Sequence, residues 1–382
     1  MSTGYKINTT TTTTTIDDIF VSSTTPSYII TNYSYKPNNV VTDIGAIFKP
    51  LSTKQYSSPT GYRFPNFNWT IKLGSPSMQY QSIACSTNSQ YIYAVGYARG
   101  YIYVSINYGL TWTTISSIGI TLFFKSISCT NDGSIVVAVA YGNNIYVSKD
   151  YGQTWADKTS VSLGVKNWYC VAVSGTSGQY MVASIYQNLI YYSDDTGDTW
   201  ATINSNNYLC NSITLSANGQ SMSIATSSST TSDYIYIGSY PFTTLTSVGT
   251  NDFWISITSS SDNTIQYACT SGSTGGIYKS TNSGSTWGKI KSFPNSKMIT
   301  TNSSGTYVYV ISSSVSYILI NKNSESDWTE SGSVLNLSWE VVKISPDNTK
   351  LIGGPGTKNI YMLNIIENPT YISDITEMFE AK

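Results

Sequence analysis

Short strands built around an Ile-Tyr or Tyr-Ile pair recur along the chain about every 40 residues, a spacing typical of propeller blades. Strand and turn patterns alternate around these pairs, as expected for short β-strands separated by polar turns. Seven copies at this interval predict a radial all-β array. The pairs are Ile102-Tyr103, Ile145-Tyr146, Ile190-Tyr191, Ile235-Tyr236, Ile277-Tyr278, Tyr317-Ile318 and Ile360-Tyr361.

Each repeat predicts four strands, and the second repeat shows them most clearly. Lys125–Thr130 is the expected inner strand, and Asn131-Asp132-Gly133 is a hairpin turn. Ile135–Ala140 is nearly all apolar, as expected for a second strand that neighbouring blades cover on both faces. Asn144–Ser148 is the third strand, and the outer strand begins at Trp155.

The two ends of the repeat region complement each other. The seventh repeat lacks an outer strand, whereas Trp69–Leu73 has the pattern of one and precedes the first repeat. Pairing them would close the ring and remove the exposed edge strands of an open array. The sequence therefore predicts an all-β, seven-bladed β-propeller of four-stranded antiparallel blades over residues 65–366, closed by an N-terminal outer strand. An N-terminal arm (1–64) and a C-terminal arm (367–382) flank it.

An octapeptide of the form Ser-x-Asp/Asn-x-Gly-x-Thr-Trp follows the third strand in four repeats. Its Asp or Asn side chain can accept hydrogen bonds from the backbone of its own turn, glycine supplies a positive φ, and the Trp ring packs between blades. A carboxylate in this turn is therefore expected to be a cap rather than a catalyst. The key positions are Ser105, Asn107, Gly109, Trp112, Ser148, Asp150, Gly152, Trp155, Ser193, Asp195, Gly197, Trp200, Ser280, Asn282, Gly284 and Trp287.

This octapeptide resembles the Asp-box, also called the BNR repeat, of sialidases, sortilin-type receptors, some xyloglucan hydrolases and photosystem assembly factors. The resemblance covers about residues 65–330. It implies a propeller whose octapeptide turns are structural and lie at the blade periphery. It implies little about function, because the families that share the motif differ in activity.

The residue inventory argues against an enzyme. The chain has no histidine, which is the usual general base and a usual zinc ligand. It has two arginines, Arg63 and Arg99, whereas sialidases hold the substrate carboxylate with three. A glycosidase needs two facing carboxylates. We expect no catalytic residue, no metal and no cofactor, although carboxylates outside the octapeptides exist at Asp132, Asp233, Asp252, Asp262 and Asp347.

Composition limits the partners and the compartment. Charged residues make up 11% of the chain and the net charge is −1, so the basic surface that nucleic acid or an anionic membrane requires is missing. No apolar stretch resembles a signal peptide or a membrane span. Five cysteines without a C-x-x-C pair favour buried, reduced thiols and synthesis in a reducing compartment. Loops rich in tyrosine, serine and asparagine suit binding of sugars or proteins.

The two arms carry three short apolar segments, here called hooks: TIDDIF, DIGAIF and DITEMF. Each suits a single amphipathic turn that docks an aromatic side chain on a neighbouring surface. The Thr-rich start with its hooks resembles the leader of virion-associated proteins of giant double-stranded DNA viruses, which implies incorporation into a particle or an external fibre. The docking residues would be Ile16, Ile19, Phe20, Ile44, Ile47, Phe48, Ile375, Met378 and Phe379.

Three hypotheses follow from the sequence. The first is a non-enzymatic structural protein, made in the cytoplasm, whose propeller is linked to neighbouring copies through its arms in a virion layer or an extracellular filament. The second is a surface-displayed propeller that binds a glycan or a receptor. The third is a carbohydrate-active enzyme, which the residue inventory disfavours.

Overall fold

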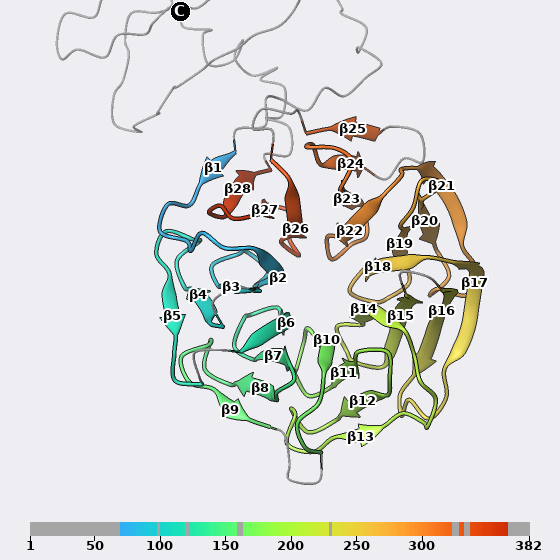
Figure 1. Cartoon of the computed structure of the whole chain (residues 1–382), viewed down its shortest axis with the longest axis horizontal. Helices are drawn as coiled ribbons and strands as arrows, with labels where there is room; N and C mark the ends of the chain where they lie inside the picture. Colours follow the sequence, from blue (N-terminus) through green and yellow to red (C-terminus); the bar gives the residue numbers. More distant parts are fainter. Residues whose placement is uncertain are drawn as a thin grey trace, which may run out of the picture. The chain divides into compact units, whose positions relative to one another are not determined.

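The computed structural model describes residues 69–97, 100–118, 122–158, 163–228, 231–322, 328–331 and 337–365. They form seven sheets, each of four antiparallel strands, arranged in a ring around a central channel (Figure 1). The described residues contain no helix, and so none that could span a bilayer. The predicted all-β, seven-bladed propeller is confirmed.

The first two strands of each blade lie nearest the channel and carry most of the core. The inner strands are β2 (Tyr80–Cys85), β6 (Phe123–Cys129), β10 (Trp168–Val173), β14 (Cys210–Leu215), β18 (Trp254–Ser259), β22 (Ser296–Thr301) and β26 (Trp339–Ile344). The second strands are β3 (Ile92–Gly96), β7 (Val136–Tyr141), β11 (Met181–Ile185), β15 (Ser221–Ser227), β19 (Gln266–Thr270), β23 (Tyr307–Ser312) and β27 (Lys350–Pro355).

The third and outer strands complete each blade toward the rim. The third strands are β4 (Ile102–Ser105), β8 (Ile145–Ser148), β12 (Ile190–Ser193), β16 (Ser232–Ser239), β20 (Gly276–Ser280), β24 (Leu319–Lys322) and β28 (Tyr361–Asn364). The outer strands are β5 (Thr113–Ile115), β9 (Ala156–Asp157), β13 (Ala201–Thr202), β17 (Thr246–Asp252), β21 (Gly288–Ser292), β25 (Trp328–Glu330) and β1 (Thr70–Ile71).

The ring is closed by β1, which comes from the N-terminal side of the propeller and joins the C-terminal blade. Thr70 pairs with Met362 and Ile71 with Tyr361, so β1 is the outer strand of the seventh blade. The Trp69 and Trp339 rings lie 4.9 Å apart, which adds an aromatic contact within that blade. The predicted closure by Trp69–Leu73 is confirmed.

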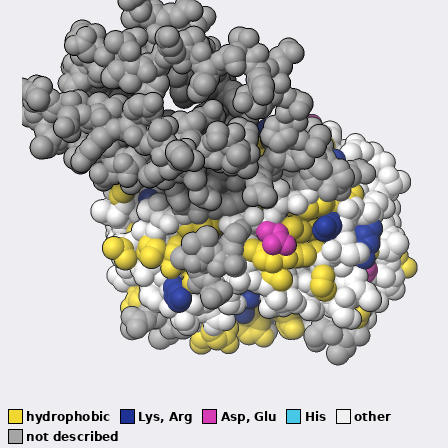
Figure 2. Space-filling model, turned by 90° about the horizontal axis from the view of Figure 1, so that it is seen from above, with side chains coloured by type: hydrophobic (Ala, Val, Ile, Leu, Met, Phe, Trp, Pro, Cys, Tyr) yellow, Lys and Arg dark blue, Asp and Glu magenta, His cyan; other side chains and the backbone are white. Residues whose placement is uncertain are grey.

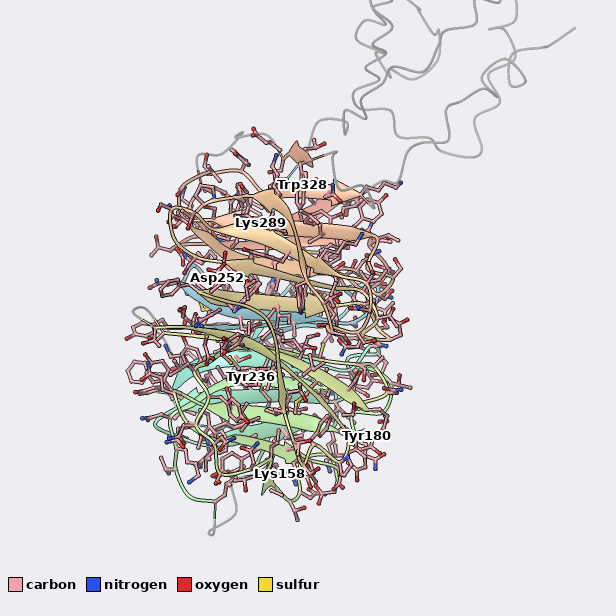
Figure 3. All side chains as sticks on the ribbon, turned by 90° about the vertical axis from the view of Figure 1, so that its right-hand side faces the viewer. Lys158, Tyr180, Tyr236, Asp252, Lys289 and Trp328 are labelled. Carbon is pink, nitrogen blue, oxygen red and sulfur yellow. The ribbon has the colours of Figure 1, made fainter. Side chains whose placement is uncertain are left out.

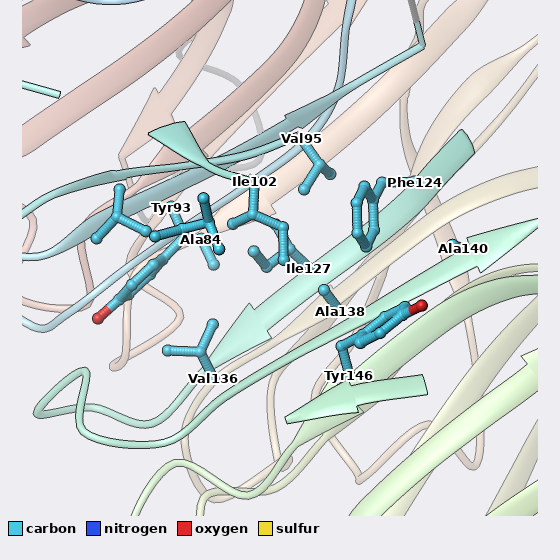
Figure 4. Close-up of a cluster of buried hydrophobic side chains, with 12 residues drawn as sticks. Ala84, Tyr93, Val95, Ile102, Phe124, Ile127, Val136, Ala138, Ala140 and Tyr146 are labelled. Carbon is cyan, nitrogen blue, oxygen red and sulfur yellow. The ribbon is translucent and has the colours of Figure 1, made fainter. Parts of the chain in front are cut away.

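The core lies between neighbouring blades rather than inside any one of them. Every residue of β3, β11 and β19 is buried, because each of these second strands is covered on both faces. Figure 4 shows the cluster between blades one and two, in which Tyr93 and Phe124 lie on opposite sides of Ile102. On the rim seen in Figure 2, the described side chains are mainly uncharged or apolar, with few charged ones.

Two elements differ from the expectation. The fourth repeat, which has no octapeptide turn, continues into β17, a seven-residue outer strand that does not begin with Trp. Most of β17 is exposed and polar, so no hydrophobic alternation marks it. The pair Tyr317-Ile318 immediately precedes β24 rather than lying within it. All nine hook residues, including Phe20, lie outside the described residues.

Candidate binding site at the channel mouth

Every inner strand carries one extra residue near its start. In all seven blades the pairing between the inner and second strands shifts register at the same place, which is the mark of a β-bulge. Bulges of this kind redirect a side chain, and here all seven side chains line the channel. The bulge residues are Gln81, Lys125, Tyr169, Asn211, Ile255, Lys297 and Glu340.

The channel is a cavity of about 770 Å³ with an excess of positive charge. Its charged lining residues are Lys125, Lys297, Lys343 and Glu340, a net charge of +2 in a chain whose net charge is −1. Lys297 forms an ion pair with Glu340 across blades six and seven. Lys125 is therefore the bulge residue whose positive charge no described carboxylate neutralises.

The opposite end of the channel is narrowed by a closed ring of backbone hydrogen bonds. The hairpin after each inner strand donates an N–H to the carbonyl of the next blade's hairpin, and the seventh returns to the first. Strands so bonded lie about 4.8 Å apart, so seven peptide groups enclose a circle of roughly 5 Å radius. The bonds, 2.7–3.3 Å long, are Thr87–Asn131, Asn131–Gly175, Thr176–Ala217, Ala217–Ser261, Ser261–Ser303, Ser303–Pro346 and Asp347–Thr87.

Hydroxyl groups along the channel wall are committed to holding the blades together. Each inner strand is the edge of its sheet, and an unpaired edge N–H needs an acceptor. Ser82 Oγ lies 3.2 Å from the Ile127 N–H of the next blade, and Ser212 Oγ lies 3.2 Å from the Ile257 N–H. Because these wall hydroxyls bond between blades and the hairpin end is narrow, the bulge face is the candidate end for a ligand.

Beside this mouth, three tyrosine rings approach Lys125, and two further aromatic residues contact these rings. The Lys125 Nζ atom lies 5.0 Å from the ring centre of Tyr97, 5.9 Å from that of Tyr141 and 5.8 Å from that of Tyr169, within cation–π range. Further ring contacts link the aromatic residues to one another. This group, here called the Lys125 cluster, comprises Lys125 with Tyr97, Phe123, Tyr141, Tyr169 and Tyr186.

The cluster is both exposed and partly desolvated. Phe123 is 50% exposed and Tyr97 is 46% exposed, high values for large rings that already touch each other. Desolvation lowers the pKa of the Lys125 ammonium. Burial raises the pKa of Tyr169 to about 12, so its hydroxyl stays protonated and can donate a hydrogen bond. The site thus presents aromatic surface, a cation and hydroxyl donors together.

The four octapeptide turns lie at the opposite face, next to the hairpins of the hydrogen-bonded ring. Asp150 Oδ1 accepts from the Thr154 N–H at 2.8 Å, and Ser148 Oγ accepts from the Gly152 N–H at 2.9 Å. Tyr151 and Gly152 both have positive φ, and Tyr151 N donates to the Ser134 carbonyl of its own blade's hairpin.

The other three turns repeat this arrangement. Asp195 accepts from the Thr199 N–H, while Asn107 and Asn282 accept from the Thr111 and Thr286 N–H groups. In each of these turns the serine Oγ accepts a hydrogen bond from the glycine N–H four residues later. The pairs are Ser105 with Gly109, Ser193 with Gly197 and Ser280 with Gly284. Rings of Trp112, Trp155, Trp200 and Trp287 each pack against the cluster shared with the preceding blade.

The five carboxylates that the sequence singled out outside the octapeptides cap hairpins or accept tyrosine hydroxyls. Asp132, Asp262 and Asp347 each accept the backbone N–H two residues later, so they cap hairpins. Asp233 and Asp252 are cross-strand partners in blade four, and each accepts a tyrosine hydroxyl. Both lie away from the channel lining, and Figure 3 shows Asp252 on the outer side of the molecule.

The cysteines of the described residues form no disulfide with one another. All five thiols are free, and four are buried. Cys129 is only partly buried, so the expectation of buried thiols is wrong for this residue. It is the last residue of β6 and lines the channel. The described residues contain no group of three or more His, Cys, Asp or Glu side chains placed to hold a metal.

The sequence did not point to the Lys125 cluster, because its members lie far apart in the chain. Tyr97 and Tyr186 end or follow second strands, and Phe123 begins an inner strand. A signal did exist: the bulge residue, which is the second residue of six inner strands and the third of β6, is Gln, Lys, Asn or Glu in five blades, where a buried strand would otherwise be apolar. This signal can be interpreted only when the bulge is known, because the bulge takes that residue out of the alternation of buried and exposed side chains along the strand.

No protein-family model matches the chain, and no curated protein matches it. Solved structures match its fold. The structure described as YCF48 bound to D1 peptide has a TM-score of 0.61 at 12% identity, covering 82% of this chain and all of that one. A Myceliophteria thermophila Cps50 (Swd1) β-propeller domain has a TM-score of 0.59 at 9% identity, covering 78% and 100%. The Niastella koreensis GH74 enzyme has a TM-score of 0.54 at 14% identity, covering 76% and 66%. At these identities the likeness concerns the fold alone.

Proposed function

We propose that the protein is a non-enzymatic binding propeller that holds a polypeptide partner against the Lys125 cluster at the channel mouth. The observation that carries this proposal is a group of exposed aromatic side chains around a cation that lacks a described carboxylate partner. Tyrosine and other aromatic anchors dominate the energy of protein interfaces, because they bury much surface at little cost in conformational entropy.

The arrangement of the rings favours a polypeptide over a glycan. Neighbouring rings are inclined by 50° for Tyr97 and Phe123 and by 65° for Tyr141 and Tyr186. Rings at such angles offer no flat platform on which successive sugar rings could stack. A similar fold is known with a peptide bound, in YCF48, and this makes a polypeptide ligand reasonable for the present chain.

Selection from a library of random 12-residue peptides, with the full chain immobilised, tests the proposal. We expect enriched peptides that bind the wild type and lose binding to a Phe123→Ala/Tyr186→Ala variant. The matched control is Tyr108→Ala/Leu110→Ala, which removes exposed apolar side chains from the opposite face. No enrichment, or equal loss in both variants, would overturn the proposal. A glycan array that gave binding where the peptides gave none would assign the cluster to sugars.

The hooks support a second role, in which the propeller is a building block. We further propose that the arms connect copies into a layer or a filament, in a virion or outside the cell. The three related hook sequences outside the blades support this idea. Light scattering of the full chain with Phe20, Phe48 and Phe379 replaced by serine would test it. An oligomeric state unchanged from wild type would refute the connection. We also propose that the four octapeptides belong to the Asp-box class; their sequence and their hydrogen bonds support this proposal.

A further inference from the structure

We infer that the partner presents a carboxylate to Lys125, so that the propeller recognises an acidic polypeptide segment. This inference rests on the proposed function and specifies the chemistry of the same site. Its starting point is the ring of seven bulge residues, because these side chains meet an entering ligand first. Among them are two lysines and one glutamate, and the glutamate is already paired with Lys297.

The surroundings of Lys125 leave its charge available to a ligand. Three tyrosine rings approach the ammonium, and a ring face stabilises a cation without neutralising it. None of the ion pairs among the described residues involves Lys125. A partly desolvated ammonium of this kind gains more from a carboxylate than a fully hydrated one does, because part of its desolvation cost is already met.

The other charges of the channel lining also favour an anionic ligand. Lys343 lies farther along the channel and adds a second positive charge outside the described ion pairs, so an anion approaching the mouth meets a net attractive field. The Tyr169 hydroxyl stays protonated and can donate to a carboxylate beside Lys125. A cationic partner would meet repulsion from Lys125 and would find Glu340 already paired.

Two peptide libraries distinguish the possible sources of the carboxylate. One presents random peptides joined to the carrier at their C-terminus, and the other presents them with a free C-terminus. Asp and Glu enriched in both libraries would indicate that side chains supply the carboxylate. Binding peptides found only in the second library would indicate that the terminal carboxylate supplies it. Selected peptides are then synthesised in free-acid and amidated forms, and their affinities for the full-length protein are measured by fluorescence anisotropy.

The variants are chosen so that charge and shape can be separated. We expect Lys125→Gln to weaken the selected peptides about 10- to 100-fold, the factor for losing a hydrogen bond to a charged group. Lys125→Arg should restore most of the affinity. Lys279→Gln is the matched control: it removes the same charge and another lysine–tyrosine contact, near Tyr267 in blade five, and should change affinity less than about twofold.

The outcomes separate this inference from the proposed function. Peptides that require Phe123 and Tyr186 but show neither Asp and Glu enrichment nor dependence on a free C-terminus, or that bind Lys125→Gln as well as wild type, would overturn the inference and leave the binding site in place. Absence of any peptide that depends on the cluster would overturn both. An acidic bias with the expected response to all three lysine variants would support both.

Discussion

Ser75 is the residue through which the closing strand is fastened to the last blade. Its Oγ atom donates to the Lys72 carbonyl at 2.6 Å and accepts from the Ile360 N–H at 2.8 Å. Ser75 is 4% exposed and Ile360 is fully buried, so water cannot replace the hydroxyl. Because β1 pairs with β28 over only two residue pairs, the closure also depends on bonds beyond the strand, among them this hydroxyl, the Lys72 N–H to the Ile360 carbonyl and the Asn359 side chain to the Ser75 carbonyl.

Replacing Ser75 by alanine should therefore lower the free energy of unfolding by more than the loss of one hydroxyl usually does. A buried N–H left without a partner costs about 1–3 kcal/mol, and the lost bond to Lys72 adds roughly 1 kcal/mol, so we expect a loss of about 2–4 kcal/mol. A domain of this size loses about 2 °C in Tm per kcal/mol, which gives a decrease of about 4–8 °C.

The measurement is thermal unfolding followed by tryptophan fluorescence, with Ser223→Ala as the matched control. Ser223 is also fully buried, but its hydroxyl has no hydrogen-bond partner in the described structure, so its removal should change Tm by less than about 2 °C. A Ser75→Ala variant that unfolds at the same temperature as Ser223→Ala would refute the role of Ser75 in closure.

Two further predictions concern the octapeptide turns. Desolvation would raise the pKa of Asp150 and Asp195, but hydrogen bonds from Thr154 and Thr199 outweigh it, so both pKa values lie below the ordinary 3.8. Their stabilisation is thus complete above that value and is lost as pH falls through the lowered pKa. Asp150→Asn/Asp195→Asn should therefore lose less stability than wild type between pH 4 and pH 2 in thermal melts; parallel curves would contradict this. Gly152→Ala should lower Tm several degrees more than Gly164→Ala. Both positions have positive φ, but only at Gly152 would the added Cβ lie 2.9 Å from Tyr93. Equal melting temperatures of the two variants would contradict this prediction.

The architecture could be read from the sequence because every blade repeats the same burial pattern. Second strands such as β7 are buried on both faces, so their apolar character survives any difference in loop length. Closure was also readable, since a surplus strand at one end matched a missing strand at the other. The outer strand β17 could not be read, because it lies at a sheet edge with mostly exposed polar side chains.

The binding site depends on geometry that no local pattern contains. Lys125 looks like an ordinary polar residue of an alternating strand until the bulge turns it toward the mouth. Tyr97 and Tyr186 are 89 positions apart and belong to one cluster only because blades one to three follow one another around the ring. Composition predicted tyrosine-rich binding loops, but it could not select which tyrosines surround a cation.

The ring of backbone hydrogen bonds at the narrow end has a consequence for how such a chain can diverge. Because the ring uses peptide groups alone, almost any residue type satisfies it, and Thr87, Ala217 and Ser303 occupy equivalent places. The exception is proline, which has no N–H. Where Pro346 stands in the seventh blade, its carbonyl accepts and the following residue, Asp347, donates instead. Blades can thus drift far apart in sequence after duplication and still join, which helps explain why a propeller recognisable from its repeats matches known propellers at identities near 10%.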